Sequence, residues 1–139
     1  MSVFSESISL QAKGFADMHN LTPRLKEILK ASKLKDGILT VILPGSTGGI
    51  TTIEYESGVL KDLSELLEKL IPSDRAYHHD AAWGDGNGFS HLRSALIGTS
   101  FSVPFKDGKL VLGTWQQVTY IDFDNRPRSR KLHVQLVGE

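Results

Sequence analysis

Apolar and polar positions alternate near both ends of the chain. In residues 3–12, Phe4, Ile8 and Leu10 fall on one side of an extended backbone, with polar residues between them. Residues 128–137 repeat the pattern, with Leu132, Val134 and Leu136 on one side. Such alternation is typical of a half-buried strand, so we expect a strand in each segment.

Other strands are predicted from apolar and β-branched runs. Residues 37–43 (GILTVIL) are apolar almost throughout, which favours a strand buried on both faces. Residues 50–56 (ITTIEYE) follow a Gly-rich turn and also have strand character. Two more strands are expected at residues 98–105 and 109–121, joined by a Lys-Asp-Gly turn.

Helical spacing occurs in two segments. Thr22 and Pro23 are predicted to be the N-cap and the first residue of a short amphipathic helix over residues 23–32. A second helix is expected to begin at Ser57 and to end before Pro72, because its leucines form one stripe and its charged residues another. Residues 73–88 are expected to be a loop, and residues 90–98 a short helix or turn.

This order of elements predicts an α+β fold. We expect a mostly antiparallel, β-sandwich-like sheet that carries two helices. With 139 residues, 40% of them hydrophobic, the chain can form one core. No repeat, linker or low-complexity tract divides it, so residues 1–139 are interpreted as one domain.

Charge and composition narrow the possible partners and locations. Sixteen basic residues balance sixteen acidic ones, which argues against a general nucleic-acid clamp. There is no cysteine, so disulfides, thiolate metal sites and cysteine nucleophiles are excluded. No apolar run approaches the roughly 20 residues that span a bilayer, and the first residues do not resemble a signal peptide. We therefore expect a cytoplasmic protein that binds neither nucleic acid nor membrane.

A histidine-rich loop is the first candidate site. His78 and His79 are adjacent, Asp80 and Asp85 follow, the latter in a Gly-rich stretch, and His91 lies twelve residues after His79. Imidazoles and carboxylates are ordinary ligands of divalent ions, so these residues could bind a metal. The spacing matches no compact zinc motif, and the alternative is that His78 or His79 is simply exposed while His91 packs at a helix start.

A glycine-rich turn is the second candidate. Ser46, Thr47 and Gly48 offer hydroxyls and backbone N–H groups that could bind a phosphate, although the turn is not a Walker A loop. The alternative is a tight β-turn. Glu54, near the end of the following strand, could act as a general base or metal ligand, or it could simply be solvated.

The segment before the last strand contains the third candidate. Arg128 and Arg130 would share one strand face, and two guanidiniums there could bind a phosphate or pyrophosphate. The alternative is a solvated hairpin in which these arginines pair with Asp122 and Asp124. Trp115 is expected in a core or a subunit interface rather than at a stacking site.

Several of these motifs together resemble the YjbQ family, sometimes described as secondary thiamine-phosphate synthases. The GTWQ signature at residues 113–116 is the most specific of them. Matching blocks run along nearly the whole chain: Ser46 to Thr51 with Glu54, Tyr77-x-His79, Asp85-Gly86-Asn87, His91-Leu92 and Arg128-x-Arg130. One departure is that Gly45 stands where the family usually has a histidine. If that histidine is one of three metal ligands in relatives, only His79 and His91 remain here, and His78 or Asp85 would have to replace it.

The resemblance implies an α+β homotrimer and an enzyme that joins a pyrimidine diphosphate to a thiazole phosphate with release of pyrophosphate. The implied site binds a small phosphorylated substrate and holds a divalent metal ion, zinc or magnesium. We assign Glu54, Asp85 and Arg128 to catalysis, Ser46, Thr47, Gly48, Asn87 and Arg130 to substrate binding, and His79, His91 and His78 to the metal. Two alternatives are a metal-assisted hydrolase of a phosphorylated or carbonyl substrate, and a non-catalytic anion-binding trimer.

Overall fold

The computed structural model describes residues 1–139, which form eight strands and four helices. The strands are β1 (Ser2–Ala12), β2 (Asp17–Asn20), β3 (Gly37–Ile42), β4 (Gly48–Glu54), β5 (Ser100–Lys106), β6 (Lys109–Leu110), β7 (Gln116–Asp122) and β8 (Arg128–Gly138). The helices are α1 (Thr22–Ser32), α2 (Ser57–Leu70), α3 (His78–Trp83) and α4 (Gly88–Ile97). The α+β class expected from the sequence is confirmed.

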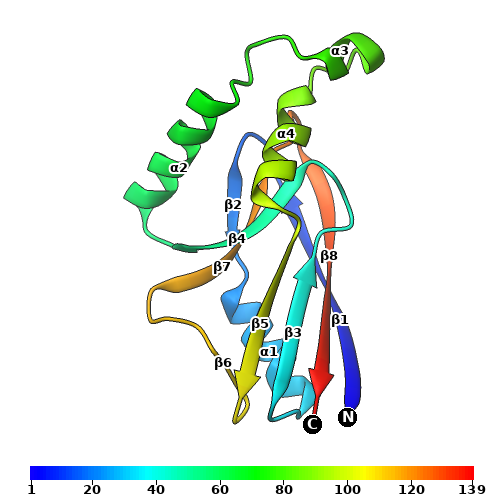
Figure 1. The fold of residues 1–139 in the computed structure, drawn as a ribbon, viewed down its shortest axis with the longest axis vertical. Coiled ribbons are helices and arrows are strands. Elements are labelled where there is room, and N and C mark those ends of the chain that lie inside the picture. The colour runs from blue at the N-terminus through cyan, green and yellow to red at the C-terminus, as the bar shows by residue number, and fades with distance from the viewer.

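All strand pairs are antiparallel and form two sheets. The larger sheet has the order β1-β8-β3-β5-β6, and the smaller has the order β2-β7-β4. In the larger sheet, β1 and β8 pair along their whole length, from Ser2 opposite Gly138 to Ala12 opposite Arg128. The two ends of the chain therefore lie side by side, at the end of the molecule opposite α3 (Figure 1).

The main core lies between the inner face of the larger sheet, α1 and one face of the smaller sheet. The inner face supplies alternate residues such as Leu132, Val134 and Leu136, all fully buried. Helix α1 contributes Leu25 and Ile28 on its apolar stripe. The predicted alternation in the last strand is confirmed, and its physical cause is that only one face of this sheet has a layer of protein against it.

The smaller sheet is buried on both faces. Tyr120 belongs to the main core, whereas Ile121 and Phe123 belong to a second cluster. Leu67 of α2 completes that cluster, so α2 covers the second face. The carboxylate of Glu56 caps α2 by accepting from two backbone N–H groups at its first turn, and these bonds lower the pKa of that carboxyl.

Two details of the predicted strands and helix caps are wrong. The strand at residues 37–43 is buried on one face only, since Ile38 remains 54% exposed on the outer face. Thr22 does not cap α1; its hydroxyl accepts from the N–H of Val118 at 2.8 Å and ties the helix to β7. The backbone N–H of Thr22 donates to the side-chain oxygen Oδ1 of Asn20 at 3.0 Å.

The long strand predicted at residues 109–121 is broken in the structure. Strand β6 ends at Leu110, and β7 begins only at Gln116. Between them, the GTWQ segment turns: the Gln116 N–H donates to the Gly113 carbonyl, and the Gln116 side chain accepts from the Gly113 N–H at 3.0 Å. Trp115 lies in this turn with 72% of its surface exposed, so it is not a core residue of this chain.

The segment predicted to be a loop contains α3. Asp80 binds the N–H of Tyr77 at 3.0 Å and so stabilises the first turn, while Gly84 ends the helix in a left-handed conformation with φ of 70°. The sequence analysis also missed the four-residue strand β2. None of the four helices has the length and apolar composition needed to cross a membrane.

Candidate functional site

Helices α3 and α4 bring two of the predicted histidines together. His79 lies in the first turn of α3 and His91 in the first half of α4, and their rings are 4.5 Å apart between centroids. Helix α4 is held on the smaller sheet because Ser94 donates to the carbonyl of Gly48 at 2.6 Å. The position of His91 is therefore fixed relative to the start of β4.

The glycine-rich turn lies beside His91. Gly45 and Ser46 line a pocket of about 300 Å³ together with His91, Ser94 and residues at the end of α4. A Cβ added at Gly45 would meet only the Leu43 side chain, at an ordinary contact distance of 3.5 Å. The structure thus joins the first two candidate sites of the sequence analysis into one.

The rest of the turn serves packing more than ligand binding. Gly48 is the buried first residue of β4, and a Cβ there would lie 2.5 Å from the Tyr120 hydroxyl. A Cβ at Gly49 would lie 2.8 Å from the Ile97 side chain of α4. Thr47 is also buried. Of the predicted phosphate-binding residues in this turn, Ser46 alone is exposed.

His79 has a buried nitrogen without a hydrogen-bond partner. Its Nδ1 atom faces carboxylate oxygens of Asp85 at 3.5 Å and of Asp80 at 3.8 Å, yet makes a hydrogen bond with neither. A buried imidazole nitrogen normally has a partner, because leaving it unpaired costs free energy. An ion between the ring and the carboxylates would satisfy this nitrogen, so the residues present fit a divalent cation.

The ligand atoms available to such an ion can be ranked. Atoms of His79, Asp80 and Asp85 lie within 4.8 Å of one another. Asp80 already accepts from the N–H groups of Gly88 and Tyr77, which lower the pKa of its carboxyl, so its oxygens are partly used. Asp85 is half exposed, and its carboxylate lies within reach of the Asn87 amide at 3.0 Å. His79, Asp80 and Asp85 therefore form the converging group, His91 adjoins it through its ring contact with His79, and the exposed His78 lies outside it.

The two predicted arginines belong to a buried polar network. Arg130 donates to the Asp122 carboxylate at 2.6 Å and to the Thr47 hydroxyl at 2.7 Å, and Arg128 donates to Asp124 at 2.8 Å. Both aspartates are completely buried. The pairing alternative is thus confirmed for both arginines, but the predicted solvated hairpin is wrong, because the pairs lie inside the protein.

Tyr120 and Arg130 show how strongly Asp122 is held. The Tyr120 hydroxyl donates to Asp122 at 2.7 Å, and burial followed by this bond raises the pKa of that phenol. Burial alone would lower the pKa of the Arg130 guanidinium, but its bonds to Asp122 outweigh burial and raise it. Arg130 is only 11% exposed, whereas Arg128 remains 35% exposed and open toward solvent.

Asn87 lies between the histidine cluster and the arginine network. In one orientation its amide donates to Asp124 at 3.4 Å, and in the flipped orientation it donates to Asp85 at 3.0 Å. Asn87 is buried and directly precedes α4. Its amide nitrogen can therefore donate to Asp85 or to Asp124, but not to both at once.

Glu54 does not join this site within one chain. It lies at the far end of β4, six residues beyond Gly48 and so about 20 Å away along the strand. There it lines another pocket, of about 400 Å³, with Asn20, Trp115 and Gln117. A role for Glu54 beside the histidines is therefore not supported by the geometry of a single chain.

The sequence pattern placed Asp80 among the possible metal ligands and Asp122 and Asp124 as possible partners of the arginines, but it revealed neither the capping bond of Asp80 nor the buried network around Tyr120. The available signal was the spacing of Tyr120, Asp122 and Asp124, since residues two apart share one face of a strand. For Asp80, the signal was its position three residues after Tyr77, the spacing at which an acidic side chain reaches back to the start of a helix.

Acid should destabilise the protein through Asp124. Burial by itself would raise the pKa of this carboxyl, but bonds from the Asn125 N–H, Arg128 and Asn87 outweigh burial and lower it. A lowered folded-state pKa contributes stability that is complete above the unfolded value near 4 and is lost as the pH falls through the folded value. We expect the melting temperature to fall below about pH 4 and Asp124→Asn to show a shallower fall. Thermal melts between pH 7 and pH 2.5 test this, and equal slopes for the two proteins would contradict it.

Known proteins resemble this chain along its whole length. A family profile described as "UPF0047 protein YjbQ-like" matches residues 6–139. A UPF0047 protein of Methanothermobacter thermautotrophicus is 34% identical over all of this chain and 95% of its own length. A crystal structure of a YbjQ-like protein of unknown function from Sulfolobus solfataricus has a TM-score of 0.94 at 26% identity, covering 99% of each chain. A YjbQ/UPF0047 structure from Clostridium acetobutylicum has a TM-score of 0.87 at 31% identity, covering 95% of this chain and 99% of that one.

Proposed function

Because this chain belongs to the UPF0047 protein YjbQ-like family, we propose that it is an enzyme acting on a small phosphorylated substrate between His79, His91 and Ser46. The observation that carries the proposal is the unpartnered Nδ1 of His79, which faces Asp85 beside the second imidazole. An unsatisfied buried nitrogen next to an open pocket is more typical of a ligand site than of a structural contact.

His79, Asp85 and His91 would hold a divalent cation, zinc or magnesium. Such an ion supplies positive charge opposite a phosphate or diphosphate group when it is bound. The hydroxyl of Ser46 lies on the same pocket as His91 and is available to donate to a phosphate oxygen. Arg128 is the better placed arginine, because it is more exposed than Arg130 and only its Nε has a protein partner.

The proposed reaction is of the thiamine-phosphate synthase type. The bond between the pyrimidine methylene carbon and the diphosphate oxygen breaks, and pyrophosphate leaves with the bonding electrons. The thiazole nitrogen of the second substrate then forms the new carbon–nitrogen bond. Positive charge at Arg128 would stabilise the departing pyrophosphate.

A homotrimer is part of the proposal. Val3, Val137 and Ile38 are cross-strand neighbours on the outer face of the larger sheet, and they are 64%, 39% and 54% exposed. An exposed apolar stripe of this kind is typical of a subunit interface. It supports burial of this face by another copy, and the mass of the assembly in solution, measured by light scattering, gives the number of copies.

Pyrophosphate release measures the reaction and separates it from its alternatives. With hydroxymethylpyrimidine diphosphate, thiazole phosphate and a divalent ion, we expect release that requires both substrates. Arg128→Met should lower kcat/KM about 100-fold, because it removes a charged contact to the leaving group. Arg126→Met is the matched control, since Arg126 is exposed and forms no ion pair with a carboxylate.

Each other outcome points to a different function. Release that does not need thiazole phosphate would support a metal-assisted hydrolase. Saturable binding of the diphosphate without release would support an anion-binding module. An absence of both binding and release would overturn the proposal for this pocket.

A further inference from the structure

A second pocket lies far from the histidines, between α1 and the β5–β6 hairpin. Its volume is about 580 Å³, within the range of small-molecule sites. In Figure 1 this hairpin and α3 are at opposite ends of the molecule. The residues around it come from α1, from the α1–β3 connection and from the hairpin. None of them takes part in the proposed reaction.

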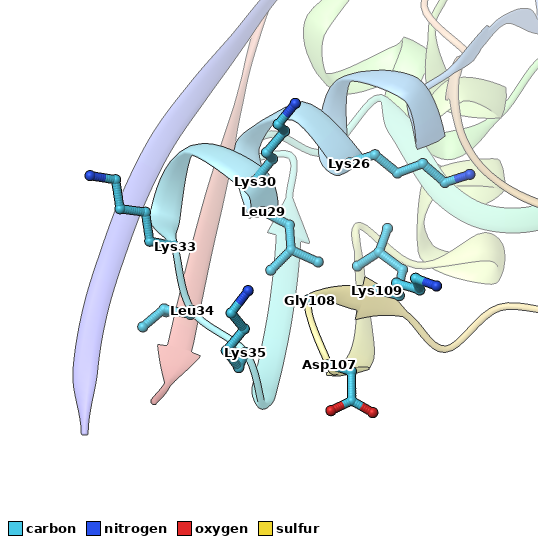
Figure 2. A pocket seen from close by; sticks show the side chains of 10 residues that line it. Lys26, Leu29, Lys30, Lys33, Leu34, Lys35, Asp107, Gly108 and Lys109 are labelled. Carbon is cyan, nitrogen blue, oxygen red and sulfur yellow. The ribbon is translucent and has the colours of Figure 1, made fainter.

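Positive charge is concentrated around this pocket. Five of the sixteen basic residues of a chain with no net charge line it: Lys26, Lys30, Lys33, Lys35 and Lys109. No carboxylate lies within 4.0 Å of any of the five ammonium groups. The one acidic residue of the lining, Asp107, directs its carboxylate away from the pocket (Figure 2).

Helix stability explains only part of this arrangement. Lys30 and Lys33 lie at the C-terminal end of α1, where cations interact favourably with the helix dipole. Lys26 and Lys30 are four residues apart, and like charges at that spacing destabilise a helix. Lys35 and Lys109 lie outside the helix, so the helix dipole does not explain why lysines occupy these positions. In Figure 2 the Lys26 and Lys33 side chains point to opposite sides, so one bound anion would offset the repulsion among only some of the five.

The floor of the pocket is apolar. Leu29 is buried, and Leu34 and Leu110 are partly buried and pack against the main core. Together with the lysines they make a surface in which an uncharged body would contact leucines while a charged group meets ammonium ions. Inorganic anions would use only half of such a site.

The two walls of the pocket are fixed to each other. Gly108 donates its N–H to the carbonyl of Lys35 at 2.9 Å, and the Asp107 N–H donates to the Asp36 carboxylate at 3.0 Å. Gly108 has a φ of 72°, which favours glycine. The Lys35 ammonium lies over this turn, 3.9 Å from where a Cβ of Gly108 would be. A ligand would therefore meet a preformed site, which lowers the entropy cost of binding.

We propose that this pocket binds a small organic phosphate through its lysines and the apolar body of the same ligand through Leu29, Leu34 and Leu110. Lysine binds phosphate as a point charge and does not need the planar geometry that arginine imposes, which suits ammonium groups arriving from three different segments. The site is independent of the histidine pocket, so it stands whether or not the proposed reaction is found.

Phenyl phosphate is a suitable probe because it combines both features. We would titrate it into the isotope-labelled protein and follow the backbone amide signals by NMR, with inorganic phosphate and phenol as partial ligands. We expect shifts concentrated at Lys35, Gly108 and Leu110, and binding of phenyl phosphate about tenfold tighter than that of phosphate, from partial burial of the ring. Phenol alone should bind more weakly than either.

A charge-matched pair of variants decides the outcome. Lys35→Gln with Lys109→Gln should weaken phenyl phosphate binding about tenfold, because two charged contacts are lost. Lys61→Gln with Lys69→Gln removes the same charge from the exposed side of α2 and should change nothing. Equal weakening by both pairs, shifts spread over all lysine-bearing surfaces, or phosphate binding as tight as phenyl phosphate would each overturn the proposal.

Discussion

Arg130→Met is expected to lower the free energy of unfolding by about 3–5 kcal/mol. The substitution leaves Asp122 and Asp124 charged inside the protein, where both side chains have no exposed surface. Arg130 contacts both carboxylates, at 2.6 Å for Asp122 and 3.8 Å for Asp124. Its removal costs more than the contacts themselves, because the buried Asp122 carboxylate loses its only cationic partner, whereas Asp124 keeps its bond from Arg128. Urea unfolding followed by circular dichroism measures the change.

Two further variants identify the cause. Arg126→Met removes an exposed arginine of the same segment and should change the free energy of unfolding by less than about 0.5 kcal/mol. Adding Asp122→Asn to Arg130→Met should restore part of the loss, because it removes the buried charge that Arg130 no longer compensates. A loss below about 1 kcal/mol for Arg130→Met would mean that water reaches these carboxylates, which would contradict the burial described above.

His79→Ala and His91→Ala are each expected to remove a bound divalent ion from the purified protein. Each substitution deletes one of only two imidazoles in the candidate site, and we expect metal affinity to fall at least about 100-fold, beyond the loss typical of groups that only orient a ligand. The measurement is metal content per chain, determined by mass spectrometry on protein purified without an affinity tag.

The chain offers two matched controls for this experiment. His133 is exposed on β8, and His78 is exposed on α3 next to His79 but outside the ligand group. His133→Ala and His78→Ala should both retain the metal. Loss of metal in His78→Ala alone would exchange the roles of the two neighbouring histidines. If all histidine variants contain as much metal per chain as the unchanged protein, these histidines do not bind it, and the proposed function would have no metal ion.

The sequence predicted the elements that have strong periodicity. The alternation in the last strand and the leucine stripe of α2 correspond to single buried faces, which is why they are visible in one sequence. Helix α3 was missed because its six residues are too few for periodicity and depend on a carboxylate cap at Asp80. The break after Leu110 was missed because Val111 and Leu112 continue an apolar run after pairing has stopped.

The sequence predicted which residues could form the candidate site, but it did not predict how all of them are arranged in space. His79, Asp85 and His91 could be chosen because imidazoles and carboxylates share metal-binding chemistry, and α3 and α4 do place them together. Arg130 was assigned to substrate, but in the structure it donates to Asp122, which lies on β7 of the other sheet, and the way the two sheets face each other is not visible in strand periodicity. Glu54 shows the same limit, since its distance from the histidines follows from the direction of β4.

The open space at Gly45 bears on how the site can evolve. The residue has no positive φ that would require glycine, and its missing Cβ would make only ordinary contact with Leu43. A histidine there would enter the pocket lined by His91 without displacing backbone. A third imidazole could therefore be added to this pocket by one substitution, Gly45→His, while the scaffold stays unchanged.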